Sequence, residues 1–146
     1  MSKKDSLYID IAQRVGLESH AVRAKVGAVL VRDDNILAYG YNGTPRGWDN
    51  DCEDVIETTN AEGEWYVKET KTKREVLHAE SNAIAKIARS TQSADGADLF
   101  VSLSPCFECA KLIVQSGIKR VVFKEKYRDD SPINFLKMNG IEVEQI

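Results

Sequence analysis

Residues 99–123 have the sequence LFVSLSPCFECAKLIVQSGIKRVVF, and the fold class can be inferred from them. Leu99 to Leu103 is a short apolar run typical of a buried strand, and Val121 to Phe123 is a second one. Between them, Pro105 stands where a proline favours the first turn of a helix, and Gly117 marks the end of that helix. The stretch therefore predicts a βαβ unit with parallel strands and a right-handed crossover.

The sequence on either side of this unit continues the alternation of helices and strands. Near residues 5–18, apolar side chains at spacings close to four predict an amphipathic helix. The remaining predicted elements are a hairpin formed by residues 25–31 and 36–40, helices over residues 78–89 and 132–139, and a strand over residues 141–143. Together these elements indicate an α/β fold without an internal repeat or a domain linker.

Residues 41–75 have a different character, with charges of alternating sign and no strong periodicity. The turn-forming residues in this stretch are Asn42-Gly43, Thr44-Pro45, Gly47, Asn60 and Gly63. A structureless stretch of this length is unusual inside a compact domain and is often functional. We treat it as a loop-rich insert in one domain spanning residues 1–146, and residues 64–74 within it are compatible with a helix.

The composition is that of one domain with a substantial hydrophobic core. The 146 residues are 42% hydrophobic, and 20 Lys and Arg against 23 Asp and Glu give a formal net charge of −3. This balance argues against a broad basic face for long nucleic acids. No apolar run approaches the roughly 18 residues of a membrane span, and no signal-peptide pattern follows residues 1–5. We therefore expect a cytoplasmic protein with neither membrane nor long nucleic acid as a partner.

Three cysteines form an odd and sparse set, which favours metal ligands or free thiols over a disulfide framework. Cys106 and Cys109 are three residues apart, so on the first turn of a helix their sulfurs share a face. His78 also opens a predicted helix, and unpaired N–H groups at both helix starts favour thiolates. One imidazole and two thiolates predict a zinc ion whose fourth position is open to water, as in catalytic sites.

Glu80 is the predicted acid–base group of this site. Residues i and i+2 of a regular helix point to nearly opposite sides, so His78 and Glu80 converge only if His78 stands at the helix entrance. In that arrangement the carboxylate of Glu80 can take a proton from water activated by zinc and return it to the substrate.

His78-Ala79-Glu80 followed by Pro105-Cys106-Phe107-Glu108-Cys109 resembles the signature of the zinc-dependent cytidine deaminase superfamily. Nearly the whole chain is similar, more narrowly, to the deoxycytidylate (dCMP) deaminases of that superfamily. The matching positions are Ser19, Arg23, residues 26–29, 40–47 and 78–84, Tyr127-Arg128 and residues 136–143. The resemblance implies a three-layer α/β fold, with a mixed five-stranded sheet, helices on both faces and zinc at two helix N-termini.

This resemblance also implies roles for individual residues. His78, Cys106 and Cys109 would hold one Zn²⁺ ion per chain, and Glu80 would move protons while dCMP becomes dUMP and ammonia, supplying dUMP for thymidylate synthesis. The residues implied in substrate binding are Asn42 at the sugar and Ser19, Arg23 and Tyr127 near the 5′-phosphate. Arg23 suits that role because its fork of N–H donors matches phosphate oxygens.

Members of this family are commonly homo-oligomers, often hexamers, activated by dCTP and inhibited by dTTP at a site between subunits. The resemblance implies that the loop after the hairpin contributes to this site through Asn42, Gly43, Thr44, Arg46 and Gly47. Some members carry a second, structural zinc. Ala21 stands here in place of a cysteine that many members have, and Lys68 provides no histidine. Cys52 therefore lacks these partners, and we expect no second zinc.

Other interpretations of the same residues stay open at this point. A redox Cys-x-x-Cys pair would leave His78 and Glu80 without a role, and a structural zinc site would need a fourth ligand, for which Cys52 is the plausible sulfur. A deaminase of bases within RNA or DNA would use the same chemistry but needs a wider, more basic channel. A catalytically silent zinc module is the remaining alternative.

Overall fold

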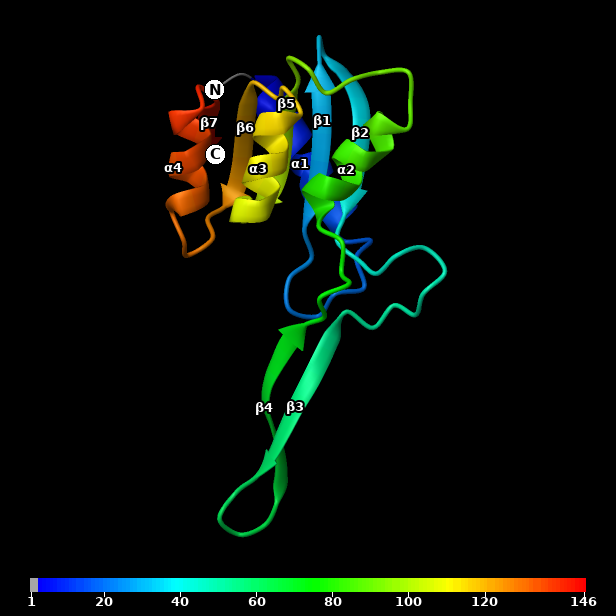
Figure 1. Cartoon of the computed structure of the whole chain (residues 1–146), viewed down its shortest axis with the longest axis vertical. Helices are drawn as coiled ribbons and strands as arrows, with labels where there is room; N and C mark the ends of the chain where they lie inside the picture. The colour runs from blue at the N-terminus through cyan, green and yellow to red at the C-terminus, as the bar shows by residue number, and fades with distance from the viewer. Residues whose placement is uncertain (1–2) are drawn as a thin grey trace.

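The computed structural model describes residues 3–146, so the first two residues of the predicted domain lie outside the described part. Figure 1 shows a layered body from which one long hairpin projects. The elements are, in chain order, α1 (Lys3–Gly16), β1 (Gly27–Arg32), β2 (Asn35–Tyr41), β3 (Glu53–Thr59), β4 (Trp65–Thr72), α2 (Ala79–Ala88), β5 (Asp98–Leu103), α3 (Phe107–Gln115), β6 (Arg120–Glu125), α4 (Ser131–Met138) and β7 (Glu142–Gln145).

The body is built on a five-stranded sheet with the order β2-β1-β5-β6-β7. β1 runs antiparallel to both β2 and β5, whereas β5, β6 and β7 are parallel to one another. This topology confirms the predicted mixed sheet and the predicted βαβ units. Helix α3 begins two residues after Pro105, because Cys106 is its N-cap, so Pro105 precedes the first turn instead of lying within it.

The side chains of the central strands alternate between two apolar clusters, one on each face of the sheet. Val29, Val31, Phe100 and Val122 pack with residues of α1, and Leu30, Leu99, Val101 and Val121 pack with residues of α2, α3 and α4. The period-2 alternation of strands therefore places helices on both faces and confirms the three-layer architecture. Within residues 3–146, no helix has the length and apolar character needed to cross a membrane.

Residues 53–72 form an antiparallel hairpin, which we call the β-arm, and the prediction of a loop or helix here was wrong. The sequence of β4 is rich in aromatic and β-branched residues, which favour strands. The turn is closed by the Asn60 side chain, which accepts hydrogen bonds from the backbone N–H groups of Glu62 and Glu64, and by Gly63 at φ +80°. Val55 and Trp65 remain exposed on the arm, which is drawn away from the body in Figure 1.

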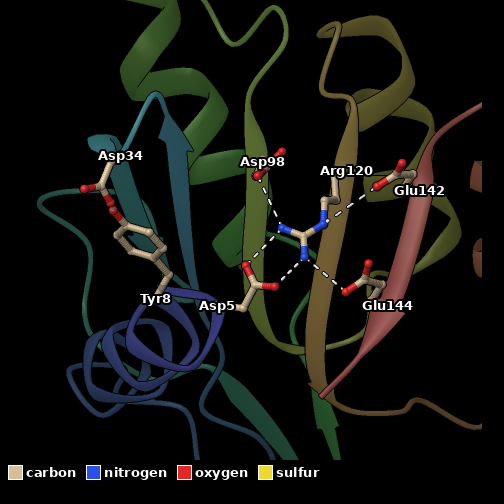
Figure 2. Close-up of polar contacts among 7 residues, drawn as sticks. All are labelled: Asp5, Tyr8, Asp34, Asp98, Arg120, Glu142 and Glu144. Carbon is tan, nitrogen blue, oxygen red and sulfur yellow. Dashed lines mark hydrogen bonds and ion pairs between the residues drawn. The ribbon is translucent and has the colours of Figure 1, made fainter. Parts of the chain in front are cut away.

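Arg120, at the start of β6, joins helix α1 to three strands of the sheet through a cluster of carboxylates (Figure 2). Both terminal nitrogens of its guanidinium donate to Asp5 of α1, a carboxylate with only 5% of its side chain exposed. Asp98 of β5 accepts at 3.3 Å and Glu144 of β7 at 3.0 Å, with Glu142 at 3.9 Å as a further ion-pair partner. The hydrogen bond to Asp5 and, to a smaller extent, the one to Glu144 raise the pKa of Arg120.

Replacing Arg120 with Ala is expected to lower the free energy of unfolding by about 3 kcal/mol, because it leaves the buried Asp5 carboxylate without its cation. Urea denaturation of wild type and variant measures this difference. The matched control is Arg14→Ala, which breaks an exposed 3.0 Å pair with Glu18 and should change stability by less than about 1 kcal/mol. Equal effects of the two substitutions would contradict a structural role for the Arg120 cluster.

The Tyr8 hydroxyl donates a hydrogen bond to Asp34 in the turn between β1 and β2. This bond, helped by burial, raises the pKa of Tyr8 from 10.0 to about 12. The neutral phenol is therefore the stabilising form, so its contribution is complete below pH 10.0 and is lost as the pH rises through about 12. We expect the stability difference between wild type and Tyr8→Phe, followed by urea denaturation, to shrink over that interval. A difference that stays constant up to pH 12 would refute the assignment.

Candidate active site

The three predicted metal ligands lie together where α2 and α3 begin. His78 Nδ1 is 3.3 Å from the Cys109 sulfur and 3.4 Å from the Cys106 sulfur, and all three donor atoms lie within 4.8 Å of one another. His78 and Cys106 are the N-caps of their helices, with extended backbones at ψ 155° and 170°. The free backbone N–H groups of both helices therefore face the donors.

The donor set fits zinc in both chemistry and spacing. Zinc ligands at about 2.0–2.3 Å in tetrahedral geometry are separated by roughly 3.5 Å, close to the two nitrogen–sulfur distances observed. Within residues 3–146, the side chains of His78, Cys106 and Cys109 form a group that could hold one metal ion. Three protein ligands leave one tetrahedral position for water or substrate, which is the arrangement of a catalytic site.

Mutual contacts determine the protonation of these donors. The hydrogen bond from Cys109, assisted by His78, lowers the pKa of Cys106 to about 4, so Cys106 is a thiolate at neutral pH. The same contact with Cys106 raises the pKa of His78, and the pKa of Cys109 is raised by its hydrogen bond to Cys106 and by burial. Binding of a divalent cation would displace the protons that these groups share.

Glu80 projects into the same pocket from the first turn of α2, although it lies only two residues after His78. The extended conformation of His78 at the helix entrance meets the condition that the sequence imposed on this pair. Glu80 is only 4% exposed, and burial raises the pKa of its carboxyl group to about 7. A carboxyl group with a pKa near neutrality can both accept and donate a proton at physiological pH.

Close packing of β2 against α2 fixes this geometry. A Cβ atom on Gly40 would lie 2.4 Å from the Ala79 carbonyl oxygen and 2.6 Å from the Ala83 nitrogen, so only glycine fits. The Asn82 side chain donates a hydrogen bond of 2.8 Å to the carbonyl oxygen of Tyr41. The start of α2 is thereby held against the loop that follows β2.

The pocket is a cavity of about 360 Å³ that contains most of the predicted site residues. Its lining residues are Ala21, Arg23, Ala24, Val26, Asn42, Thr72, Val76, His78, Ala79, Glu80, Leu103, Ser104, Cys106 and Tyr127. The predicted phosphate ligands Arg23 and Tyr127 are both exposed and so are accessible to a ligand. Cys109 is buried beside the other two donors and does not line the cavity.

Ser19 and Asn42 support the pocket wall. Ser19 is 2% exposed, does not line the cavity, and donates a hydrogen bond of 2.7 Å to the Asn42 carbonyl oxygen. The Asn42 side chain donates to the Ala24 carbonyl at 2.8 Å and accepts from the Val26 N–H at 2.9 Å. Asn42 thus reaches the cavity while it fastens the preceding loop, whereas the structure places Ser19 behind that loop.

The five residues predicted to bind a regulatory nucleotide line a second, larger cavity of about 700 Å³. They are Asn42, Gly43, Thr44, Arg46 and Gly47. The opposite wall adds two cations from α2 and the residue after it, Lys86 and Arg89. Cys52 also lines this cavity, although it is itself only 2% exposed and packs with Ala21 and Val76.

Three residues in and around the 360 Å³ pocket were not predicted from the sequence. Ser104 and Thr72 line it, and Ser104 accepts a hydrogen bond of 2.7 Å from the Tyr127 backbone N–H. Glu53, at the base of the β-arm, is a buried carboxylate that contacts the loop containing Arg23. No motif marks these residues, because their roles depend on contacts between segments distant in the sequence.

A histidine, two cysteines and a buried glutamate at two helix N-termini of a mixed α/β sheet match the residue pattern of zinc-dependent deaminases. Residues 2–125 match the family model described as "Cytidine and deoxycytidylate deaminase zinc-binding region", and the chain belongs to this family.

Particular relatives within this family are deoxycytidylate deaminases. The enzyme of Enterobacteria phage T4 is 35% identical over 96% of this chain and 88% of that protein. The enzyme of Schizosaccharomyces pombe is 35% identical over 97% of this chain and 43% of that protein. Among solved structures, the dCMP deaminase from the cyanophage S-TIM5, in complex with dCMP and dUMP, matches with a TM-score of 0.85 at 38% identity, covering 100% of this chain and 99% of that one.

Proposed function

We propose that this protein catalyses the hydrolytic deamination of dCMP to dUMP and ammonia, with one zinc ion per chain. The observation that carries the proposal is the buried Glu80 carboxylate beside the His78, Cys106 and Cys109 donors, in a cavity with Arg23 in its wall. The similarity to dCMP deaminases over almost the whole chain supports the choice of substrate. The product would serve thymidylate synthesis.

His78, Cys106 and Cys109 would hold the zinc ion, which when bound activates water at neutral pH. Glu80 would take a proton from water as the water oxygen adds to C4 of the cytosine ring, and would pass this proton to N3. It would then take the remaining proton from the added hydroxyl group and deliver it to the departing amino group, so that ammonia leaves and the uracil ring remains. Burial of Glu80 assists because the surrounding protein excludes bulk water from the reacting atoms.

The remaining residues of the cavity would select a nucleotide. Arg23 offers paired N–H donors to the 5′-phosphate, and the Tyr127 hydroxyl offers a further donor. The side-chain NH₂ group of Asn42 donates one hydrogen to the backbone, and its second hydrogen would be donated to the sugar. Ser19 would act indirectly, by holding Asn42 in place.

We further propose regulation by dCTP as activator and dTTP as inhibitor at the larger cavity. Its glycine-containing loop and three cations, Arg46, Lys86 and Arg89, suit a triphosphate. A homo-oligomer, expected to be a hexamer in the cytoplasm, would bring this cavity to a subunit boundary. Mass measurement in solution with and without dCTP, combined with rates at low dCMP, tests both points.

Comparison of substrates tests the proposed function against deamination of bases in nucleic acids. The zinc-loaded protein should act on dCMP with a much higher kcat/KM than on deoxycytidine, because deoxycytidine lacks the phosphate that Arg23 would bind. It should be nearly inactive on a short cytosine-containing oligonucleotide. Preference for the oligonucleotide would overturn the proposal.

A further inference from the structure

The first pair of residues in the β-arm contacts the loop that carries Arg23. Glu53 of β3 lies opposite Thr72 of β4 at the base of the arm. Both oxygens of the Glu53 carboxylate accept the Val22 backbone N–H, at 2.6 and 3.2 Å. The Thr72 hydroxyl oxygen accepts a hydrogen bond of 3.4 Å from the Arg23 guanidinium. One pair of arm residues therefore holds two consecutive residues of this loop.

Ala21 packs with Cys52 and Val76, but the loop lacks apolar packing at the next residue, Val22, where polar contacts anchor it. The Val22 side chain is 82% exposed and cannot fix the backbone by burial. Ahead of it, the Ala21 N–H donates to the Ser19 hydroxyl oxygen at 3.1 Å. Glu53 accepts a hydrogen bond from the backbone N–H of Val22, the residue immediately before Arg23. A hydrogen bond to a charged carboxylate is stronger than one between neutral groups.

A buried glutamate such as Glu53 is unusual at a position with a purely structural role. It is 6% exposed, and a buried carboxylate lowers stability unless hydrogen bonds compensate for its lost hydration. Its contacts on the loop are to the single backbone N–H of Val22, next to a residue that lines the cavity. A buried charge in this place fixes the direction of the backbone entering Arg23.

We propose that Glu53 is a positioning residue for recognition of the substrate's 5′-phosphate. Glu53 orients the backbone of Arg23 through the Val22 N–H, and Thr72 holds the Arg23 guanidinium toward the cavity. The base of the β-arm therefore sets the enzyme's preference for a nucleotide over a nucleoside. This inference rests on the proposed function, in which Arg23 binds the phosphate.

Steady-state kinetics of Glu53→Ala on two substrates test the role. We expect KM for dCMP to rise roughly tenfold with little change in kcat, and kcat/KM for deoxycytidine to stay within about twofold of wild type. Glu53→Gln keeps one acceptor oxygen and should show a smaller rise in KM. The matched control is Glu57→Ala, an exposed glutamate on the same strand, which should leave both substrates unaffected. An equal loss of kcat/KM on both substrates would overturn the proposal.

A double-mutant cycle shows whether Glu53 acts through Arg23. Glu53→Ala should weaken binding of dCMP in wild type but change it by less than about twofold when Arg23→Ala is already present. The same factor in both backgrounds would refute the inference.

Calorimetric binding of dUMP separates the two proposals. A protein that binds dUMP more weakly after Glu53→Ala, yet does not deaminate dCMP, would refute the proposed reaction while supporting the positioning role. Unchanged dUMP affinity in a folded Glu53→Ala variant would refute the positioning role alone.

Discussion

Replacing Glu80 with Gln is expected to lower kcat for dCMP by roughly 10²–10⁴-fold while zinc content stays at the wild-type value. The amide keeps the size of the side chain in its closely packed position but can neither accept nor deliver the proton that the reaction needs. Zinc should remain because its three ligands, His78, Cys106 and Cys109, are unchanged. Initial rates and metal analysis of the same preparation measure both quantities.

A neighbouring glutamate provides the control for this prediction. Glu108 lies between the two cysteines on the first turn of α3, but its side chain is 80% exposed and pairs with Lys111 at 3.1 Å. Glu108→Gln should therefore retain near-wild-type kcat. Full activity of Glu80→Gln would refute the proton-transfer role, and loss of zinc together with activity would point to a structural role for Glu80. A catalytically silent zinc module would show no turnover even in wild type.

Replacing Cys109 with Ser is expected to abolish activity, weaken zinc binding and destabilise the fold. Cys109 is buried against both other donors, so its loss leaves too few ligands for a stable tetrahedral site. A ligand that binds only the folded state contributes about 4 kcal/mol when present at a thousandfold excess over Kd, and the variant loses this contribution. Thermal melting with and without chelator measures the effect.

Cys52→Ser is the matched control for this second prediction. Cys52 is also buried, but it packs with Ala21 and Val76 apart from the three donors. Its replacement is expected to reduce stability while leaving one zinc ion per chain and the chelator-dependent shift in melting. A loss of zinc in Cys52→Ser would contradict the prediction that the chain binds no second zinc through Cys52. Unchanged melting of wild type after verified zinc removal would contradict the coupling of metal to folding.

The body of the fold and the grouping of His78, Cys106 and Cys109 could be predicted from the sequence because both depend on local patterns. The βαβ unit at residues 99–123 has short apolar strands and a helix bounded by proline and glycine. Helix geometry allows His78 and Glu80 to converge only if His78 stands at the entrance of the helix. The structure meets this condition, because His78 is the N-cap of α2.

The β-arm could not be predicted in the same way because both of its faces remain largely exposed. A half-buried strand shows alternating apolar and polar residues, but Val55 and Ile56 are adjacent and both exposed. The side-chain hydrogen bonds that close the turn at Asn60 leave no periodic signal. The stretch therefore resembled a loop.

Contacts between distant segments were also beyond sequence analysis. Asp5 and Arg120 are 115 residues apart, and Val22 and Glu53 are 31 residues apart. Taken alone in the sequence, Asp5, Arg120 and Glu53 each resemble an ordinary surface charge. Their roles emerge only when the sheet brings α1 beside β6, and the base of the β-arm beside the loop before β1.

Reconstitution of the metal-free protein with zinc is the most direct test that His78, Cys106, Cys109 and Glu80 form a dCMP deaminase. Initial rates of dUMP and ammonia formation from dCMP would be measured against zinc bound per chain. We expect the rate to rise in proportion to zinc and to level off at one ion per chain, with dUMP and ammonia formed in equal amounts. Absence of turnover at full zinc occupancy, with or without dCTP, or full activity without zinc, would contradict this conclusion.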